Sequence, residues 1–161
     1  MDFRISRSSV DGVDDSHLFW AVIDPVWPDA SVGDELKHIA SATPGQRAIY
    51  AATLFIREVD NGGLDQFFSN SSGMYAEEVL KGLRLLGAEQ HASVVEQAFR
   101  IFPEGKVPID REERVNLMRA IPKGELKQVL EPLDEELFGE QRLWPFFRKY
   151  IELHPQEFFV D

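Results

Sequence analysis

Residues 58–73 have the sequence EVDNGGLDQFFSNSSG and constrain the fold of this chain more than any other segment. Two turn signals stand close together in it, Asn-Gly-Gly at residues 61–63 and Ser-Ser-Gly at residues 71–73. A Gly or Asn just beyond a helix end adopts the left-handed conformation that terminates the helix. A Ser ahead of a new apolar periodic run is a favoured N-cap. The segment therefore predicts a helix end, a tight turn, a short helix, a second tight turn and a new helix start.

The polar and aromatic side chains of this segment are as informative as its glycines. Four uncharged hydrogen-bonding residues are close enough in sequence to meet at one node: Asn61, Gln66, Asn70 and Ser71. Because buried polar groups are almost always paired, we expect these four to be buried and to bond the backbone of the two turns. The node is either a structural lock or a binding site. Phe67 and Phe68 point in different directions on a helix, which predicts a core position for at least one and partial exposure for the other.

Helical periodicity dominates the rest of the chain, and alternating strand patterns are nearly absent. The clearest helix start is Thr43, which is followed by Pro44 at the first helical position and by Gln46 three residues past the cap. Asp110 and Glu113 form a second capping box. Helices are predicted over residues 14–23, 43–59, 74–86, 89–102, 110–121, 124–138 and 142–153, with a short one from a Ser31 cap to residue 40 and a break or kink at Pro132.

Length and composition favour a single compact all-α domain of several helices spanning residues 1–161. The 161 residues include 12 Phe and are 43% hydrophobic, which is ample material for a core. We expect residues 1–40, an acidic N-terminal segment, to pack on this domain. Near the other end, Phe158, Phe159 and Val160 must be buried somewhere. Docking onto the chain's own core is favoured over a dimer contact, and monomer and homodimer both remain open.

Negative charge is the strongest compositional signal. The net charge is −11, and no Lys or Arg occurs between residues 8 and 36. Such a field repels nucleic acid and membrane surfaces and attracts basic partners. The candidate partner-binding carboxylates are Asp11, Asp14, Asp15, Asp24, Asp29, Asp34 and Glu35 near the N-terminus, and Glu131, Asp134, Glu135 and Glu136 in a second cluster.

Two sets of these carboxylates have the spacing of one helix face. The N-terminal row is Asp11, Asp14 and Asp15, and the second row is Glu131, Asp134 and Glu135. Lys123 and Lys127 lie near the second row and would partly neutralise it, whereas we expect no basic residue to neutralise the first row in this way. Rows of carboxylates on rigid helices are what a protein needs to imitate DNA, which carries one negative charge per ~1.7 Å of its axis.

The patterns of catalytic and cofactor sites are absent from the sequence. The four histidines (His17, His38, His91 and His154) lack metal-ligand spacing, and neighbouring acids such as Glu77 and Glu78 do not face each other on a helix. No phosphate loop, dinucleotide fingerprint or nucleophile elbow surrounds Gly62, Gly63, Ser71 or Ser72, which favours turn and cap roles. We therefore expect a non-enzymatic protein without metal or cofactor. The lack of Cys, of a signal-peptide core and of an apolar run near ~20 residues predicts a cytoplasmic protein without membrane contact.

The segment from residue 43 to residue 88 resembles a bacterial family named for its DNA-mimic member, a small acidic all-α protein. The resemblance begins with TPGQRAIY at residues 43–50 and ends with LGA at residues 86–88. Its signature residues are Asn61, Gly62, Gly63, Gln66, Phe67, Phe68, Asn70, Ser71, Ser72 and Gly73. This spaced pattern identifies the family, whose characterised member binds a transcription factor in place of DNA. That activity depends on surface carboxylates, so the resemblance implies a structural role for the signature.

The sequence thus favours an acidic protein-binding module that occupies the DNA-binding surface of a basic regulator or nucleoid protein. The alternative is an immunity or antitoxin-type protein that neutralises a basic toxin, because acidity serves both functions. A third possibility is an enzyme that uses the polar node, which would require a deep pocket with a strongly perturbed acid.

Overall fold

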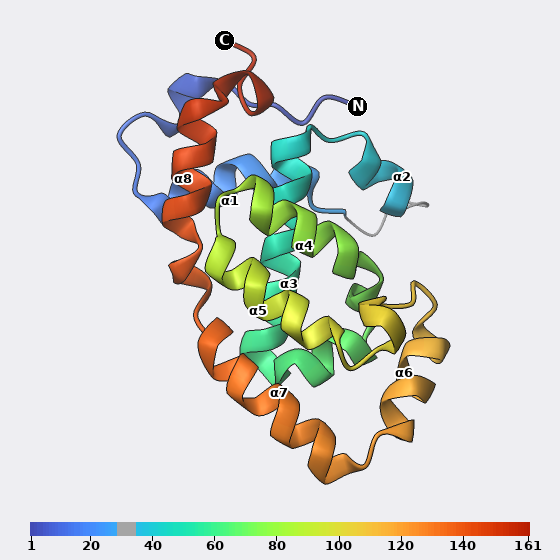
Figure 1. Ribbon diagram of the computed structural model, residues 1–161. Coiled ribbons are helices and arrows are strands. Elements are labelled where there is room, and N and C mark those ends of the chain that lie inside the picture. Colours follow the sequence, from blue (N-terminus) through green and yellow to red (C-terminus); the bar gives the residue numbers. More distant parts are fainter. Residues whose placement is uncertain (29–34) are drawn as a thin grey trace.

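The computed structural model describes residues 1–28 and 35–161 and confirms the all-α prediction, since no strand occurs in the described chain (Figure 1). The described α-helices are α1 (Asp15–Ile23), α2 (Glu35–Ala40), α3 (Pro44–Ser69), α4 (Ala76–Leu85), α5 (Glu89–Phe99), α6 (Arg111–Ala120), α7 (Lys123–Leu137) and α8 (Trp144–Leu153). Short 3-10 helices occur at Arg7–Val10, Asp24–Val26, Ser71–Tyr75, Pro103–Gly105, Glu140–Arg142 and Pro155–Glu157. The predicted Ser31 cap lies outside the described residues.

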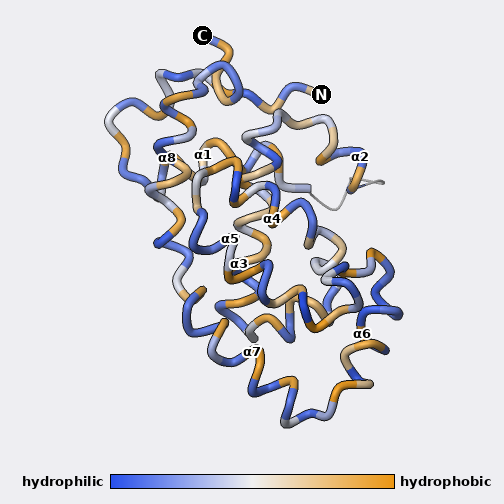
Figure 2. Tube along the Cα trace, in the orientation of Figure 1, coloured by the Kyte–Doolittle hydropathy of each residue, from blue (hydrophilic) through white to orange (hydrophobic). Residues whose placement is uncertain are grey.

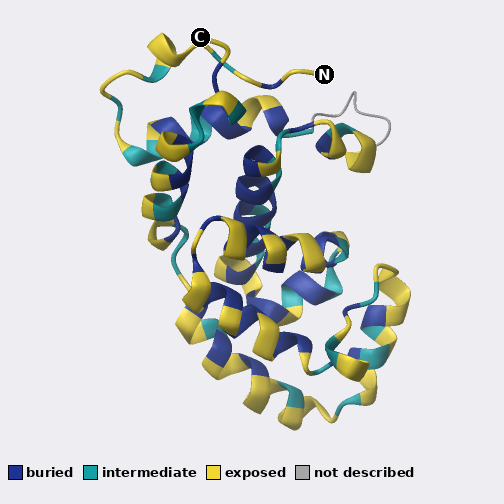
Figure 3. Ribbon diagram, turned by 45° about the horizontal axis from the view of Figure 1, so that its top comes forward, coloured by how far each residue is buried: buried dark blue, intermediate teal, exposed yellow. Residues whose placement is uncertain are grey.

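The long helix α3 runs through the centre of the molecule, and the other helices pack around it (Figure 1). It contacts α1, α4, α6, α7 and α8. Its first half is almost entirely buried, with Ile49, Phe55, Ile56 and Val59 withdrawn from solvent (Figure 3). The outer helices α4, α5 and α7 alternate between hydrophobic and hydrophilic residues along the chain, as amphipathic helices do when one face covers a core (Figure 2).

The start of α3 follows the prediction from the sequence. The Thr43 hydroxyl accepts a hydrogen bond from the Gln46 N–H at 3.2 Å, and the Gln46 side chain accepts one from the Thr43 N–H at 3.1 Å. Pro44 occupies the first helical position. Together these features satisfy orphan donors and preset the backbone for a helix. The Asp110 side chain caps α6 by accepting from the Glu113 N–H at 2.8 Å, but the reciprocal bond that would complete the predicted capping box is absent from these described residues.

The predicted turn at residues 61–63 is a kink inside α3. Gly62 and Gly63 have non-helical dihedral angles, and Gly63 has φ of 74°, which strains any residue with a Cβ. A Cβ at Gly63 would also stand 2.6 Å from Asp134 Oδ2 on α7. The kink therefore needs glycine for two reasons, and it sets the last part of α3 against α7.

The segment after the kink carries both phenylalanines into the core. Phe67 and Phe68 are both fully buried, so the partial exposure expected for one of them is wrong. Phe67 packs edge-on against Phe55 with ring centroids 4.9 Å apart, and Phe68 packs against Phe102 at 5.0 Å. Both rings are enclosed, because Phe55 before the kink covers Phe67 and Phe102 after α5 covers Phe68. The second turn follows at once, and a Cβ at Gly73 would clash with a backbone carbonyl 2.9 Å away.

The two ends of the described chain meet at one end of the molecule (Figure 1). The Ile5 N–H donates to the Phe158 carbonyl at 2.9 Å, and the Val160 N–H donates to the Ile5 carbonyl at 3.1 Å. Phe158 and Phe159 are buried, which confirms that the C-terminal aromatic residues dock onto the chain's own core. Val160 is 58% exposed, so its expected burial is wrong. The N-terminal segment also contacts this core, since α1 packs on α8 and α3.

Two further differences from the predicted helices concern α7 and α5. α7 continues through Pro132 to Leu137, so the expected break is wrong there. Pro132 is exposed, and burial of its neighbours Leu130 and Leu133 on the other side of the helix holds the segment together. α5 ends at Phe99, because the next residues form tighter i to i+3 bonds. Among the described helices, none is both long enough and apolar enough to cross a membrane.

Candidate functional site

A polar cluster built on Glu58 adjoins the kink of α3. Its carboxylate Oε2 accepts hydrogen bonds from Gln66 Nε2 at 2.6 Å and from Asn70 Nδ2 at 3.1 Å. Its Oε1 accepts from Ser72 Oγ at 2.7 Å. Asn61 extends the cluster by donating from Nδ2 to Gln66 Oε1 at 3.1 Å. We call these five residues the Glu58 node. Three donors occupy the carboxylate, so the node ties both turns of the signature together.

The Glu58 node differs from the predicted one in its hub and its members. Asn61 and Ser71 are exposed and the other two predicted members are half-buried, so the expected burial is only partly right. The hydrogen bonds run to a carboxylate rather than to the backbone of the turns. Ser72 takes part where Ser71 was expected, and neither serine makes a side-chain cap. The sequence signal for this hub, which the prediction did not use, is a carboxylate shortly before a run of amides and hydroxyls.

Arg114 of α6 holds the same segment in place, and the sequence patterns did not predict this role. Its guanidinium is fully buried and donates to the carbonyls of Phe68 at 2.9 Å and Asn70 at 2.8 Å. It also donates to the carbonyls of Pro108 at 2.9 Å and Ile109 at 2.6 Å. Burial lowers its pKa from the ordinary arginine value. Arg114 thus bonds four backbone carbonyls in place of a carboxylate. Through these bonds it connects the signature turn to the loop before α6.

A second polar region, which we call the acidic hollow, lies where the kink faces α7. It is a surface depression of about 310 Å³. Its main polar and aromatic lining residues are Asp60, Asn61, Glu131, Asp134, Glu135 and Phe138. No basic side chain is among the described residues that line it. The fold therefore brings the signature turn and the second acidic row together, although about seventy residues separate Leu64 from Asp134 in the sequence.

Asp134 has a structural part in the hollow. Its Oδ1 accepts a hydrogen bond from the Leu64 N–H at 2.7 Å and so caps the helix that restarts after the kink. Burial raises the pKa of Asp134, and the nearby carboxylates Asp65 and Glu131 raise it further, while the bond from Leu64 opposes the rise. Burial is the largest cause of the raised pKa, and the two neighbouring carboxylates add to it.

The other acids of the second cluster differ in how much the protein uses them. Glu131 pairs with Lys127 at 3.7 Å on the exposed face of α7, which is the partial neutralisation expected from the sequence. Glu135 and Glu136 are exposed and make no hydrogen bond or ion pair within the described chain. Asp60, absent from the predicted set, caps the turn after α7 by accepting from the backbone N–H groups of residues 139 and 140.

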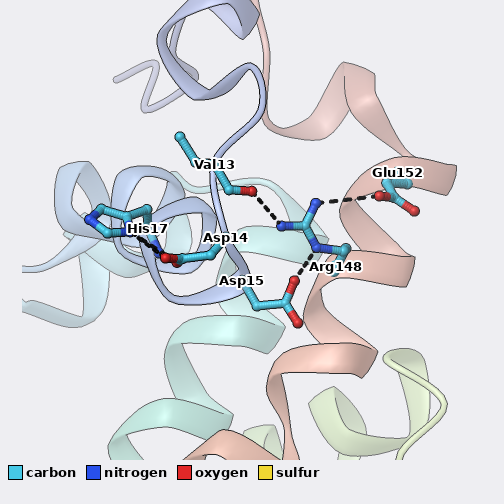
Figure 4. Close-up of polar contacts among 6 residues, drawn as sticks. All are labelled: Val13, Asp14, Asp15, His17, Arg148 and Glu152. Carbon is cyan, nitrogen blue, oxygen red and sulfur yellow. Dashed lines mark hydrogen bonds and ion pairs between the residues drawn. The ribbon is translucent and has the colours of Figure 1, made fainter.

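Asp14 and Asp15 of the N-terminal row make contacts within the protein (Figure 4). Asp11 lies before the start of α1, so the three acids do not form the predicted row on one helix face. Asp14 caps α1 by accepting from the His17 N–H at 2.9 Å, and these bonds together with the His17 ring lower the pKa of Asp14. Asp15 forms an ion pair with Arg148 of α8, which also donates to the Val13 carbonyl at 3.0 Å. The expectation that no basic residue accompanies this row is therefore wrong. Arg148 lies far away in sequence, and the packing of α8 on α1 brings it close.

The remaining predicted acids are scattered. Asp11 and Asp24 are exposed, and Asp29 and Asp34 lie outside the described residues. Glu35 accepts hydrogen bonds from the hydroxyls of two buried tyrosines. Within residues 1–28 and 35–161, no group of three or more His, Asp or Glu side chains is arranged to hold a metal ion.

Comparison with known families decides the relationship. Residues 40–154 match the family model described as DMP19-like protein, and this span is more than half of the chain. The chain belongs to the DMP19-like family. The family is that of DNA mimic protein 19, so the resemblance drawn from residues 43–88 is confirmed. No curated protein and no solved structure matches the chain.

The extent of the DMP19-like match separates the two acidic rows. The matched span contains the Glu58 node, Arg114 and the whole acidic hollow. Residues 1–39, and with them the N-terminal row, lie outside it. Of the two rows, only the one on α7 therefore belongs to the part of the chain that relates it to DNA mimics.

Proposed function

We propose that this DMP19-like protein is a non-enzymatic DNA mimic whose acidic hollow occupies the DNA-binding surface of a basic regulator or nucleoid protein. The observation that carries the proposal is the hollow itself, where carboxylates from α3 and α7 converge within the family-matched span. Membership in a DNA-mimic family supports the proposal, because that family is not a class of enzymes.

The spacing of the carboxylates supports the imitation of a phosphate backbone. Glu131 and Glu135 are about one helical turn apart, so their backbone positions are separated by about 6 Å along the axis of α7. One strand of DNA presents a phosphate every ~3.4 Å of axis, so the row on α7 corresponds to every second phosphate. Asp60 stands across the hollow on α3 and adds charge from a second element. Carboxylates from two elements thus flank the depression, a row on α7 and the single Asp60 on α3.

The chemistry of the hollow suits the side chains that normally hold phosphates. An Arg or Lys of the partner would meet Glu131 and Glu135 and the unbonded edge of Asp134. Phe138 is 45% exposed beside them and offers a ring face to a cation. Asp11, Asp24 and Glu136 lie on other surfaces and contribute to the long-range attraction set by the net charge of −11.

The proposal is tested by capture and competition. The protein is immobilised, host lysate is passed over it at low salt, and bound proteins are eluted with increasing duplex DNA. A DNA mimic should retain a basic DNA-binding protein that duplex DNA releases, because both ligands use one surface. The matched control carries Glu131→Gln and Glu135→Gln and should retain much less of the same protein.

Two results would contradict the proposal. If the captured protein stays bound at saturating duplex DNA, its contact surface is not its DNA-binding surface, as for a toxin held by an immunity protein. If the double variant captures as well as the wild-type protein, the acidic hollow is not the contact face.

A further inference from the structure

A deep apolar groove opens between α2, α3, α4 and the loop of residues 107–109, away from the acidic hollow. Its volume is about 630 Å³, within the range that binding pockets occupy. Its apolar wall consists mainly of Leu36, Ile39, Met74, Val107 and Ile109. Leu36 is 52% exposed and Ile109 is 74% exposed, so the rim continues the apolar surface outward. Exposed apolar surface that surrounds a cavity is typical of a contact site for another protein.

The two tyrosine hydroxyls at the floor of the groove have no proton left to donate to an occupant. Tyr50 and Tyr75 line it, and their hydroxyls donate to Glu35 Oε1 at 3.2 and 2.8 Å. Burial and the adjacent Glu35 raise the pKa of both phenols, so both hydroxyls stay protonated and donating. The floor therefore presents aromatic rings, which favour apolar groups on an occupant.

The charges around the groove favour a cationic occupant. Both basic lining residues are engaged by the protein, Arg47 with the carbonyls of residues 40 and 42 and Lys81 with Glu78. Glu77 is exposed and makes no hydrogen bond or ion pair within the described residues. The groove lining holds two carboxylates and two cations, and Glu35 beside the floor adds a third carboxylate. The net charge of −11 adds to this preference at long range.

We propose that this apolar groove docks an amphipathic segment of a protein partner, with apolar side chains in the groove and flanking Lys or Arg residues opposite Glu77 and Glu35. A second copy of this chain is a poor occupant, because two surfaces of the same negative sign repel each other. The groove thus supplies an apolar contact separate from the acidic hollow. The proposal does not depend on the proposed DNA mimicry, because it concerns a different surface.

Methionine methyl groups provide a local readout for this proposal. The chain has three Met, of which Met74 lines the groove and Met118 lines a different depression. Protein labelled at the methionine methyls is titrated with a synthetic helical peptide made of Leu and Lys, and separately with a matched peptide made of Leu and Glu. We expect the Leu–Lys peptide to shift the Met74 resonance and leave Met118 in place. The Leu–Glu peptide should shift neither.

Rim variants with matched controls locate the contact. Ile109→Asp and Glu77→Lys change exposed rim residues and should weaken the Met74 titration about tenfold, as expected when an apolar anchor or its charge partner is lost. The controls are Leu153→Asp on α8, where Leu153 is 66% exposed, and Glu135→Lys in the acidic hollow. Both controls should leave the Met74 titration unchanged. Urea midpoints confirm that all four variants remain folded.

Several outcomes would overturn the proposal. An equal response to both peptides would remove the charge argument. If Glu135→Lys abolishes the Met74 shift while Ile109→Asp retains it, the peptide binds at the acidic hollow. A Met74 shift that depends on protein concentration alone would identify a second copy as the occupant. An equal shift with decylammonium that the rim variants do not weaken would identify a pocket for small amphiphiles.

Discussion

The Glu58 node and the acidic hollow both adjoin the kink of α3 and both contain carboxylates, but the carboxylates have different surroundings. In the Glu58 node, one carboxylate is matched by three donors from the signature turns. In the acidic hollow, four carboxylates share a lining without a basic residue among those described. Within the hollow, Asp60 and Asp134 cap backbone N–H groups and Glu131 pairs with Lys127, whereas Glu135 makes no hydrogen bond or ion pair within the described chain. Carboxylates enclosed by several donors hold a fold together, whereas exposed carboxylates without such donors are available to a partner. The comparison shows that the surroundings of an acid, rather than its position in a cluster, decide its role.

The strongest test of this contrast concerns Arg114, which belongs to the matched side. Arg114→Met should destabilise the protein by about 3 kcal/mol, because it removes the donors of four carbonyl groups and leaves those that are buried unpaired. Urea denaturation measures the free energy of unfolding. Arg119→Met, on the same helix and exposed, is the control and should change it by less than about 0.5 kcal/mol. Equal stability of the two variants would show that the anchor is dispensable.

A second test concerns the hub of the Glu58 node. Glu58→Ala should cost about 2 kcal/mol, because Gln66, Asn70 and Ser72 lose their shared acceptor. Asn70→Ala removes one of these donors and should cost about 1 kcal/mol. Glu135→Ala, in the hollow, should leave the free energy of unfolding nearly unchanged. If Glu58→Ala is as stable as Glu135→Ala, the distinction between matched and unmatched carboxylates fails.

A third and smaller effect is expected for Asp134, which takes part in both roles. Asp134→Ala should lose about 1 kcal/mol with the cap on Leu64, while Asp134→Asn keeps an acceptor and should be as stable as wild type at pH 7. Because the pKa of Asp134 is raised in the folded state, its contribution to stability is full below the unfolded pKa of ~3.9 and is lost as pH rises through the folded pKa. The wild-type protein should therefore gain stability relative to Asp134→Asn as pH falls from 7 toward 4.

Urea midpoints of the wild-type, Asn and Ala proteins at a series of pH values check this behaviour. A difference between wild type and Asp134→Asn that does not change with pH would mean that burial and neighbouring acids do not perturb Asp134. A fully stable Asp134→Ala would mean that the restart of α3 needs no cap from α7.

Local sequence signals predicted most of the helices. The capping box at Thr43, the glycines of the kink and the apolar periodicity act over a few residues, so they can be seen without the fold. The candidate site was predictable only in part. Glu131 and Glu135 stand out as a helical row, but their meeting with Asp60 depends on how α7 packs on α3.

The errors have the same origin. Asp15 looks unpaired in the sequence because its partner Arg148 is supplied by α8. Arg114 gave no signal because its partners are backbone carbonyls, which every residue possesses. Pairing across the fold is a tertiary property, and charge spacing along one segment does not reveal it.

The most direct test of the central claim compares two double variants that each remove two negative charges. Glu131→Gln with Glu135→Gln neutralises two of the four acids of the acidic hollow, and Asp14→Asn with Asp15→Asn neutralises two of the three acids of the N-terminal row while keeping Asn as a good N-cap. Association rates with the DNA-displaceable partner are measured for both variants and the wild-type protein at about 0.05 and 0.5 M salt. We predict several-fold slower association at low salt and a weaker salt dependence for the hollow variant alone. Equal rates for the two variants, or a larger loss in the N-terminal variant, would contradict the account.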